Sequence, residues 1–162
     1  AVERHMAAQC SGGCPGSAVR TMAPRRVAES KSGADRPSML SQWPVQLKLV
    51  PPSAPFLAGA DILVCADCVP FALAGFHEKY LSDRVVLVGC PKLDDIGYYG
   101  EKLRQIIAVA KPASVTVLRM EVPCCSGIAR AAVTARDAVA PELPVRVETI
   151  GINGEVLDTE IV

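Results

Sequence analysis

The sequence lacks any long apolar run. No segment of the 162-residue chain approaches the roughly 18 consecutive apolar residues of a membrane-spanning helix, and the N-terminal region lacks the apolar core of a secretory signal peptide. It also lacks an excess of charge, because 17 Lys and Arg balance 17 Asp and Glu. A net charge of zero argues against a general affinity for nucleic acid. We therefore expect a soluble, cytoplasmic protein that neither spans a membrane nor binds nucleic acid.

The sequence motifs of several large enzyme classes are also missing. The chain contains no G-x-S-x-G, no H-E-x-x-H and no Walker-type glycine loop. Its two histidines, His5 and His77, stand far apart. These absences leave hydrolase and nucleoside-triphosphatase functions without support.

Cysteine, in contrast, is abundant. Seven cysteines occur, at positions 10, 14, 65, 68, 90, 124 and 125. An odd number is a poor basis for a disulfide framework, and a chain of this length can form a hydrophobic core without one. In a reducing compartment, clustered cysteines more often indicate metal or redox chemistry.

The apolar pattern divides the chain into an N-terminal arm, residues 1–40, and a folded domain, residues 41–162. The arm is rich in Gly, Ser, Ala, Pro and Arg and shows no sustained apolar period. In the domain, short β-forming runs alternate with helical stretches, which predicts an open, mainly parallel α/β sheet with flanking helices, of the Rossmann or flavodoxin type. The predicted strands are 44–50, 61–66, 84–90, 113–120 and 145–152, the predicted helices are 69–81, 94–110 and 125–140, and Asn-Gly in 151–157 predicts a C-terminal β-hairpin.

The cysteines fall where the predicted strands end. Cys68, Cys90, Cys124 and Cys125 each follow a strand, and such loops meet at one edge of a parallel sheet, where these folds bind ligands. Each loop also leads into a helix N-terminus, which favours thiolates and an anionic centre. We therefore predict a shared site. Cys65, inside the apolar run ILVCAD, fits better as a small core residue.

Two metal centres are compatible with this placement. Structural zinc prefers paired local C-x-x-C units, and only Cys65 and Cys68 have that spacing. An iron–sulfur cluster is larger and is well served by cysteines that converge from several loops. The pattern favours the cluster, with zinc as the alternative.

Several segments resemble blocks of an α/β domain found in ferredoxin-like 4Fe-4S-binding proteins. These segments are GCPGS (13–17), SQWPVQLKLVPPSAPFLAGADILVCADCVPFA (41–72), GCPKLDD (89–95) and RMEVPCCSG (119–127). The resemblance implies a [4Fe-4S] centre, for which the matching cysteines are Cys14, Cys68, Cys90, Cys124 and Cys125. It also implies that the arm folds onto the cluster edge, since Cys14 could not otherwise be a ligand. Cys10 and Cys65 are not among these matching cysteines and are secondary candidate ligands.

Two departures from the family pattern bear on function. The two-cluster ferredoxin segment that many members carry does not precede Cys10. Five matching thiols also exceed the four that an ordinary cubane uses, so we expect the adjacent Cys124 and Cys125 to differ in importance.

Three functions remain open at this point. The first is electron transfer with a redox protein partner. The second is a reductive enzyme that uses an open iron site or the spare cysteine on a small substrate. The third is a structural zinc-binding domain.

Overall fold

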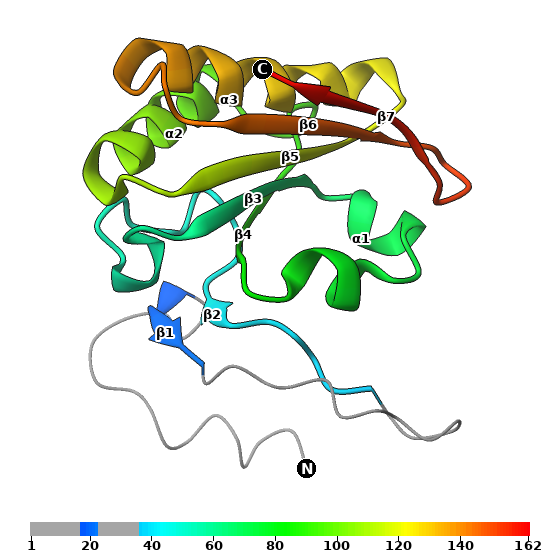
Figure 1. The fold of residues 1–162 in the computed structure, drawn as a ribbon, viewed down its shortest axis with the longest axis horizontal. Coiled ribbons are helices and arrows are strands. Elements are labelled where there is room, and N and C mark those ends of the chain that lie inside the picture. The colour runs from blue at the N-terminus through cyan, green and yellow to red at the C-terminus, as the bar shows by residue number, and fades with distance from the viewer. Residues whose placement is uncertain (1–16, 23–35) are drawn as a thin grey trace.

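A five-stranded sheet between two layers of helices forms the body of the protein (Figure 1). The computed structural model describes residues 17–22 and 36–162. The strands lie in the order β4-β3-β5-β6-β7, the first four parallel and β7 antiparallel to β6. Their bounds are β3 Asp61–Ala66, β4 Val85–Gly89, β5 Ser114–Met120, β6 Val145–Ile150 and β7 Val156–Ile161. The predicted open parallel sheet with a C-terminal hairpin is confirmed.

The parallel strands form where the sequence has continuous apolar runs. Five of the six residues of β3 are buried, because helices cover both faces of this central strand. The four predicted strands of the sheet agree with the observed ones to within two residues. The burial of both faces explains this agreement, since it requires apolar residues at nearly every position.

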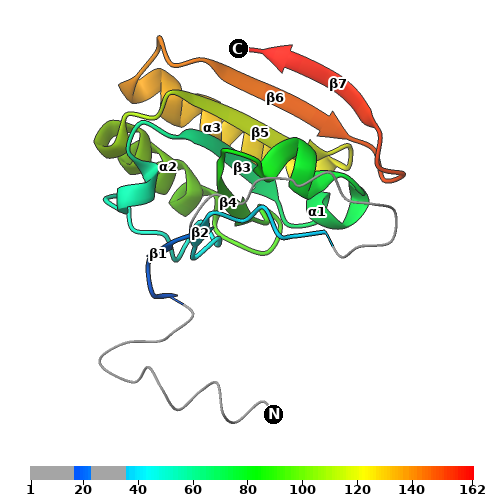
Figure 2. The same ribbon diagram turned by 60° about the horizontal axis from the view of Figure 1, so that its bottom comes forward.

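Helices α2 (Ile96–Ala110) and α3 (Ser126–Val139) pack on one face of the sheet (Figure 2). The other face is covered by α1 (Val69–Ala72) and the π-helical turn η4 (His77–Leu81). The prediction of one helix over 69–81 is wrong, because Leu73 leaves the helical conformation and a turn at Ala74 and Gly75 separates the two pieces. The buried Leu73 and Phe76 anchor that turn to the sheet.

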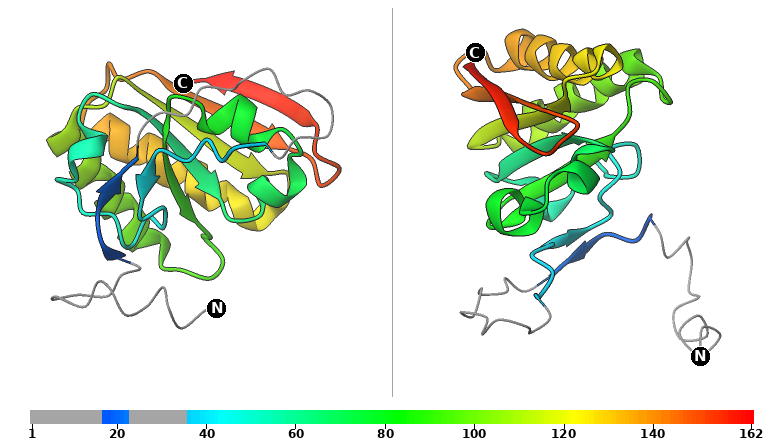
Figure 3. Two further views of the ribbon diagram at one scale, coloured as in Figure 1. Left: turned by 90° about the horizontal axis from the view of Figure 1, so that it is seen from below. Right: turned by 90° about the vertical axis from the view of Figure 1, so that its right-hand side faces the viewer.

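The predicted strand 44–50 is also wrong. Strand β2 (Gln42–Trp43) precedes it and pairs with β1 (Arg20–Thr21) beside the β4 edge of the sheet (Figure 3). Within 44–50 a single bridge joins Gln46 to Val88, and the chain then turns. The turn places Leu47 and Val50 in the core, so the alternating pattern reflects a turn with two buried residues.

The β6–β7 hairpin turn is tied to the carboxyl edge of the sheet. Gly154 adopts a φ of 90°, and a Cβ there would collide with the Ala72 carbonyl oxygen at the end of α1. The main-chain N–H of Ile152 also donates to Glu121 Oε1, 2.9 Å away, in the loop after β5. Three segments distant in sequence therefore meet at this edge.

Among the described residues, none of the helices combines the length and the apolar character that crossing a lipid bilayer requires. Of the predicted arm, residues 17–22 and 36–40 are described, and Arg20 and Thr21 pair with β2 near the start of β4. The remainder of the arm, with Cys10 and Cys14, lies outside the described residues, and the predicted packing of the arm on the cluster edge lies there too.

Candidate functional site

The carboxyl edge of the sheet contains the point where the chain reverses its winding direction. The chain passes from β3 to its neighbour β4 across one face of the sheet. From β4 it returns across the opposite face, passes β3, and forms β5 on the other side of β3. Neighbouring β3 and β5 therefore send their following loops to opposite faces, the arrangement that in open α/β sheets leaves a crevice at the strand ends. Ligands bind at such crevices in open α/β sheets.

Four cysteines follow the three strands around this crevice. Cys68 comes two residues after β3, Cys90 directly after β4, and Cys124 and Cys125 in the 3-10 turn η5 (Pro123–Cys125) after β5. Because β4, β3 and β5 are adjacent in the sheet, the fold brings all three cysteine-bearing loops to one edge. Convergence of these loops is the feature that the sequence predicts.

Close contacts hold the three loops against one another. The main-chain N–H of Asp67 donates to the Gly89 carbonyl at 3.1 Å, which ties the β3 loop to the β4 loop. Gly127, at the start of α3, approaches Pro91 so closely that a Cβ would stand 3.1 Å from the proline Cβ. The loop of Cys90 therefore contacts both the loop of Cys68 and the start of α3.

The thiols themselves differ in exposure. Cys65 is fully buried and Cys125 is 4% exposed, whereas Cys68 and Cys124 are exposed and Cys90 is half-buried. Burial, followed by the charges of Asp67 and Cys125, raises the pKa of the Cys65 thiol, so it stays protonated. Its thiol donates to the Ala66 carbonyl at 3.4 Å, in agreement with a packing role.

Cys125 lies within reach of the other thiols. Burial is the main cause that raises its pKa, a hydrogen bond with the Met120 main chain opposes this, and the neighbouring Cys124 and Cys68 raise it further. Cys124 and Cys125 also share a side-chain hydrogen bond. These interactions place Cys68 and Cys124 within electrostatic reach of Cys125.

The described cysteine side chains nevertheless do not form a metal-ligating group by themselves. Within residues 17–22 and 36–162, no cluster of three or more His, Cys, Asp or Glu side chains is arranged to hold a metal ion. The burial pattern gives the reason, because Cys65 and Cys125 point into the core while Cys68 and Cys124 face outward. The predicted ligands Cys10 and Cys14 are outside the described residues.

The donor chemistry does fit an iron–sulfur centre. Thiolates are the ligands of such clusters, and the N-terminus of the 14-residue helix α3 follows directly on the Cys124–Cys125 pair. The positive end of that helix favours an anionic centre. The residues present therefore suit the cluster by type and position, although their side chains do not converge on one point.

Polar side chains that sequence reasoning does not select support the loop of Cys90. The Tyr99 hydroxyl accepts from the Cys90 main-chain N–H at 3.0 Å and donates to Asp94 Oδ2 at 2.5 Å. Lys48 Nζ lies 3.2 Å from Asp94 Oδ1, and the hydrogen bonds from Tyr99 and then Lys48 hold the pKa of Asp94 below its usual range. No motif links Tyr99 to Cys90; their contact depends on the packing of α2 against β4.

Asp67 is a further unpredicted polar residue at the crevice. Its Oδ1 is buried without a hydrogen-bond partner in the described part of the chain. Burial and then the charge of Asp94 raise its pKa, while a hydrogen bond from Gln46 lowers it. Its position between Cys65 and Cys68 in C-A-D-C is the one signal that could have drawn attention to it.

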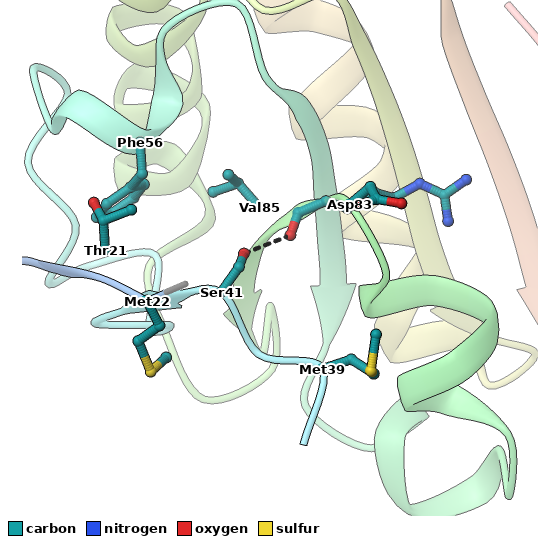
Figure 4. A pocket seen from close by; sticks show the side chains of 8 residues that line it. Thr21, Met22, Met39, Ser41, Phe56, Asp83 and Val85 are labelled. Carbon is teal, nitrogen blue, oxygen red and sulfur yellow. Dashed lines mark hydrogen bonds between the residues drawn. The ribbon is translucent and has the colours of Figure 1, made fainter. Parts of the chain in front are cut away.

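A separate pocket opens at the opposite, amino edge of the sheet. It has a volume of about 280 Å³ and lies between the β1–β2 pair and the start of β4 (Figure 4). Met22, Met39 and Phe56 give it an apolar lining, and the Ser41 hydroxyl donates to the Arg84 carbonyl at 3.2 Å. None of the residues that line it is a cysteine.

The fold and the carboxyl-edge crevice define a Rossmann-like protein. The family model described as Rossmann-like domain matches residues 54–162, and the chain belongs to this family. A protein of Archaeoglobus fulgidus, described as uncharacterized, is 39% identical over 89 residues, which cover 55% of this chain and 62% of the relative. The chain thus spans less than two thirds of the length of this relative. No solved structure matches the chain significantly.

Proposed function

We propose that the carboxyl edge of this Rossmann-like domain binds one [4Fe-4S]-type cluster and that the protein exchanges electrons with a protein partner. The observation that carries this proposal is the order of the strands in the sheet. Three adjacent strands, β4, β3 and β5, deliver Cys90, Cys68 and the Cys124–Cys125 pair to one edge of the sheet. When bound, such a cluster supplies one-electron redox chemistry.

The exposure of the thiols selects the ligands within this proposal. Cys68, Cys90 and Cys124 are at least partly exposed and lie on loops beyond the strand ends, so they are the proposed ligands. Cys14 is the proposed fourth ligand because of the sequence resemblance. Cys125, which is buried next to Cys124, serves in this proposal to pack the loop rather than to bind iron.

An electron-transfer role has support from the surface around these cysteines. Phe71, three residues after Cys68, is 91% exposed, and Leu93, three residues after Cys90, is 82% exposed. Exposed apolar side chains beside a redox centre suit contact with another protein. The pockets of about 280, 380 and 470 Å³ in the described part of the chain, in contrast, have no cysteine in their lining.

A reductive enzyme is the second candidate, and Asp67 is the observation in its favour. The buried carboxyl oxygen of Asp67, beside Cys68, has no partner in the described part of the chain. Such a group could hold a proton for a substrate bound next to the cluster. An iron site that lacks a thiolate would give such a substrate a place to bind.

Anaerobic purification followed by iron and sulfide analysis tests the cluster. We expect brown protein with about four irons and four sulfides per chain, bleached by dithionite. Cys68→Ser, Cys90→Ser and Cys124→Ser should each remove most of the iron. Cys125→Ser should retain most of it.

Cys65→Ala is the matched control, because Cys65 is buried in β3 of the same edge but is not a proposed ligand. It should keep the iron content of the unsubstituted protein. Colourless protein that contains one zinc ion per chain would contradict the cluster and indicate the structural zinc site. Loss of iron in both Cys124→Ser and Cys125→Ser would show that both adjacent thiols are needed.

Electron exchange with proteins separates the two redox functions. Dithionite-reduced protein, freed of excess reductant, should reduce cytochrome c, a one-electron protein acceptor, with about one electron per cluster. Phe71→Ser and Leu93→Ser should slow this exchange while leaving the iron content unchanged. If only small molecules accept the electrons, and both variants behave like the unsubstituted protein, the result favours the second candidate function, a reductive enzyme.

A further inference from the structure

A second pocket lies behind the cysteine-bearing turn, on the face of the sheet covered by α3. It has a volume of about 380 Å³ and opens between α3 and strands β6 and β7. Arg119 and Arg130 line it from β5 and α3, and Val147 forms part of its floor. Pockets of this size accommodate small metabolites.

The two arginines differ from the other described arginines in lacking side-chain partners among the described residues. Arg36, Arg104, Arg136 and Arg146 each form an ion pair, and Arg84 donates to main-chain carbonyls. Arg20 also has an interaction. Arg119 and Arg130 alone form no side-chain ion pair or hydrogen bond with the described part of the chain.

Arg119 is the more unusual of the two because it is partly buried. It occupies the same face of β5 as Val115 and Val117, under the first turns of α3. Its Nε is inaccessible to solvent and has no hydrogen-bond partner among the described residues. A buried guanidinium nitrogen without a partner is costly, and an anion in the pocket would remove that cost.

One carboxylate also faces the pocket. Glu160 lies opposite Val147 in the β6–β7 pairing, and it forms no ion pair with either arginine. Two guanidinium groups therefore line the pocket without an ion pair to any side chain that lines it. Because no ion pair forms, Glu160 does not neutralise either arginine at close range.

We propose that this pocket binds a small molecule through an oxyanion group, a carboxylate or a phosphate, held by Arg119 and Arg130. A guanidinium offers paired N–H donors that match both kinds of oxyanion. Thr134, on the same side of α3 one turn beyond Arg130, lines the pocket with a hydroxyl, and Val147 provides apolar contact for the remainder of the molecule. The site does not depend on a cluster at the cysteines.

Titrations at constant ionic strength test the site on the full chain. The probes are inorganic phosphate and pyrophosphate in one arm, and succinate and citrate in the other, each up to about 10 mM, with heat of binding as the readout. We expect saturable binding in at least one arm. Binding in the phosphate arm alone identifies a phosphate-bearing ligand, and binding in the carboxylate arm alone identifies a carboxylic acid.

Arginine variants locate the bound anion. Arg119→Gln and Arg130→Gln should each weaken binding by about tenfold or more, since each removes a charged hydrogen-bond donor. Arg104→Gln is the matched control, because Arg104 is an arginine on α2 that pairs with Glu101, and it should bind like the unsubstituted protein. If Arg119→Gln does not fold, the exposed Arg130 carries the test.

Three results would overturn the proposal. The first is the absence of saturable binding in both arms. The second is binding that survives in Arg130→Gln and in folded Arg119→Gln. The third is an equal loss in Arg104→Gln, which would show that the anions respond only to the overall charge of the protein.

Discussion

The two edges of the central sheet are built from the same strands but differ in chemistry. At the carboxyl edge, four cysteines follow the strand ends and a buried Asp67 oxygen lacks a partner in the described chain. At the amino edge lie pockets of about 280 and 470 Å³, and neither is lined by a cysteine. The cysteines therefore lie apart from these two pockets, at the carboxyl end of the parallel strands, where open α/β sheets bind ligands.

The amino-edge connections are instead closed by main-chain hydrogen bonds. The N–H of Gly59 donates to the Ala110 carbonyl and that of Ala113 to the Ala60 carbonyl, which joins two loops directly. Across the same edge the Ser114 hydroxyl donates to Asp61 at 2.6 Å. These contacts join the amino-edge loops to one another through the chain's own donors and acceptors.

The largest predicted difference between the edges comes from two glycines. A Cβ at Gly89, at the carboxyl end of β4, would stand 2.6 and 2.9 Å from ring carbons of the buried Tyr99. Gly89→Ala should lower the free energy of unfolding by about 1–3 kcal/mol or more through overpacking. Urea denaturation measures this.

Gly59→Ala is the comparison at the amino edge. A Cβ at Gly59 would have no neighbouring atom within 4 Å, so the cost is limited to its φ of 64°, about 1–2 kcal/mol. If Gly59→Ala were the more damaging substitution, the tight Tyr99 contact would not control the stability of the carboxyl edge.

The second prediction separates cysteines inside the sheet from those beyond it. Cys65→Ser places a hydroxyl in a fully buried site, and we expect a loss of about 1–3 kcal/mol in the metal-free protein, measured by urea denaturation. Cys68→Ser, three residues later on an exposed loop, should change stability by less than about 0.5 kcal/mol. Equal losses would indicate that Cys68 packs more tightly than its exposure implies.

The third prediction compares one side-chain hydrogen-bond group at each edge. Tyr99→Phe removes the bonds to Asp94 and to the Cys90 N–H and should cost about 1–2 kcal/mol. Ser114→Ala removes the exposed bond to Asp61 and should cost about 0.5 kcal/mol or less. Thermal unfolding of both variants ranks them; the reverse order would contradict a supporting role for Tyr99.

The smallest effect concerns thiol reactivity within the carboxyl edge. In reduced, metal-free protein, iodoacetamide should modify Cys68 and Cys124 first, Cys90 later, and Cys125 and Cys65 last. Burial raises the pKa of Cys125, so a smaller fraction of this thiol is the reactive thiolate at neutral pH, and its modification should speed up as the pH rises. Peptide mass spectrometry over time gives the order. Early modification of Cys125 would contradict the packing role assigned to it.

Local sequence pattern is enough to specify the sheet and the edge that carries the cysteines. Continuous apolar runs such as 61–66 are stable as strands when both faces are covered, so the parallel sheet follows from the pattern. Given that sheet, the cysteines after its strands share an edge, because parallel strands end on the same side. The placement of the cysteines along the sheet is thus encoded locally.

Contacts between distant segments determine the features that the local sequence pattern does not specify. The apolar alternation of 44–50 fits a strand as well as a turn that buries Leu47 and Val50, and only the neighbouring β4 and helix packing select the turn. The same holds for the site. Adjacent Cys124 and Cys125 are equivalent in sequence, but the loop geometry exposes one and buries the other, and Tyr99 reaches Cys90 only because α2 packs against β4. Side-chain direction depends on tertiary packing, so it is fixed only when the layers have assembled.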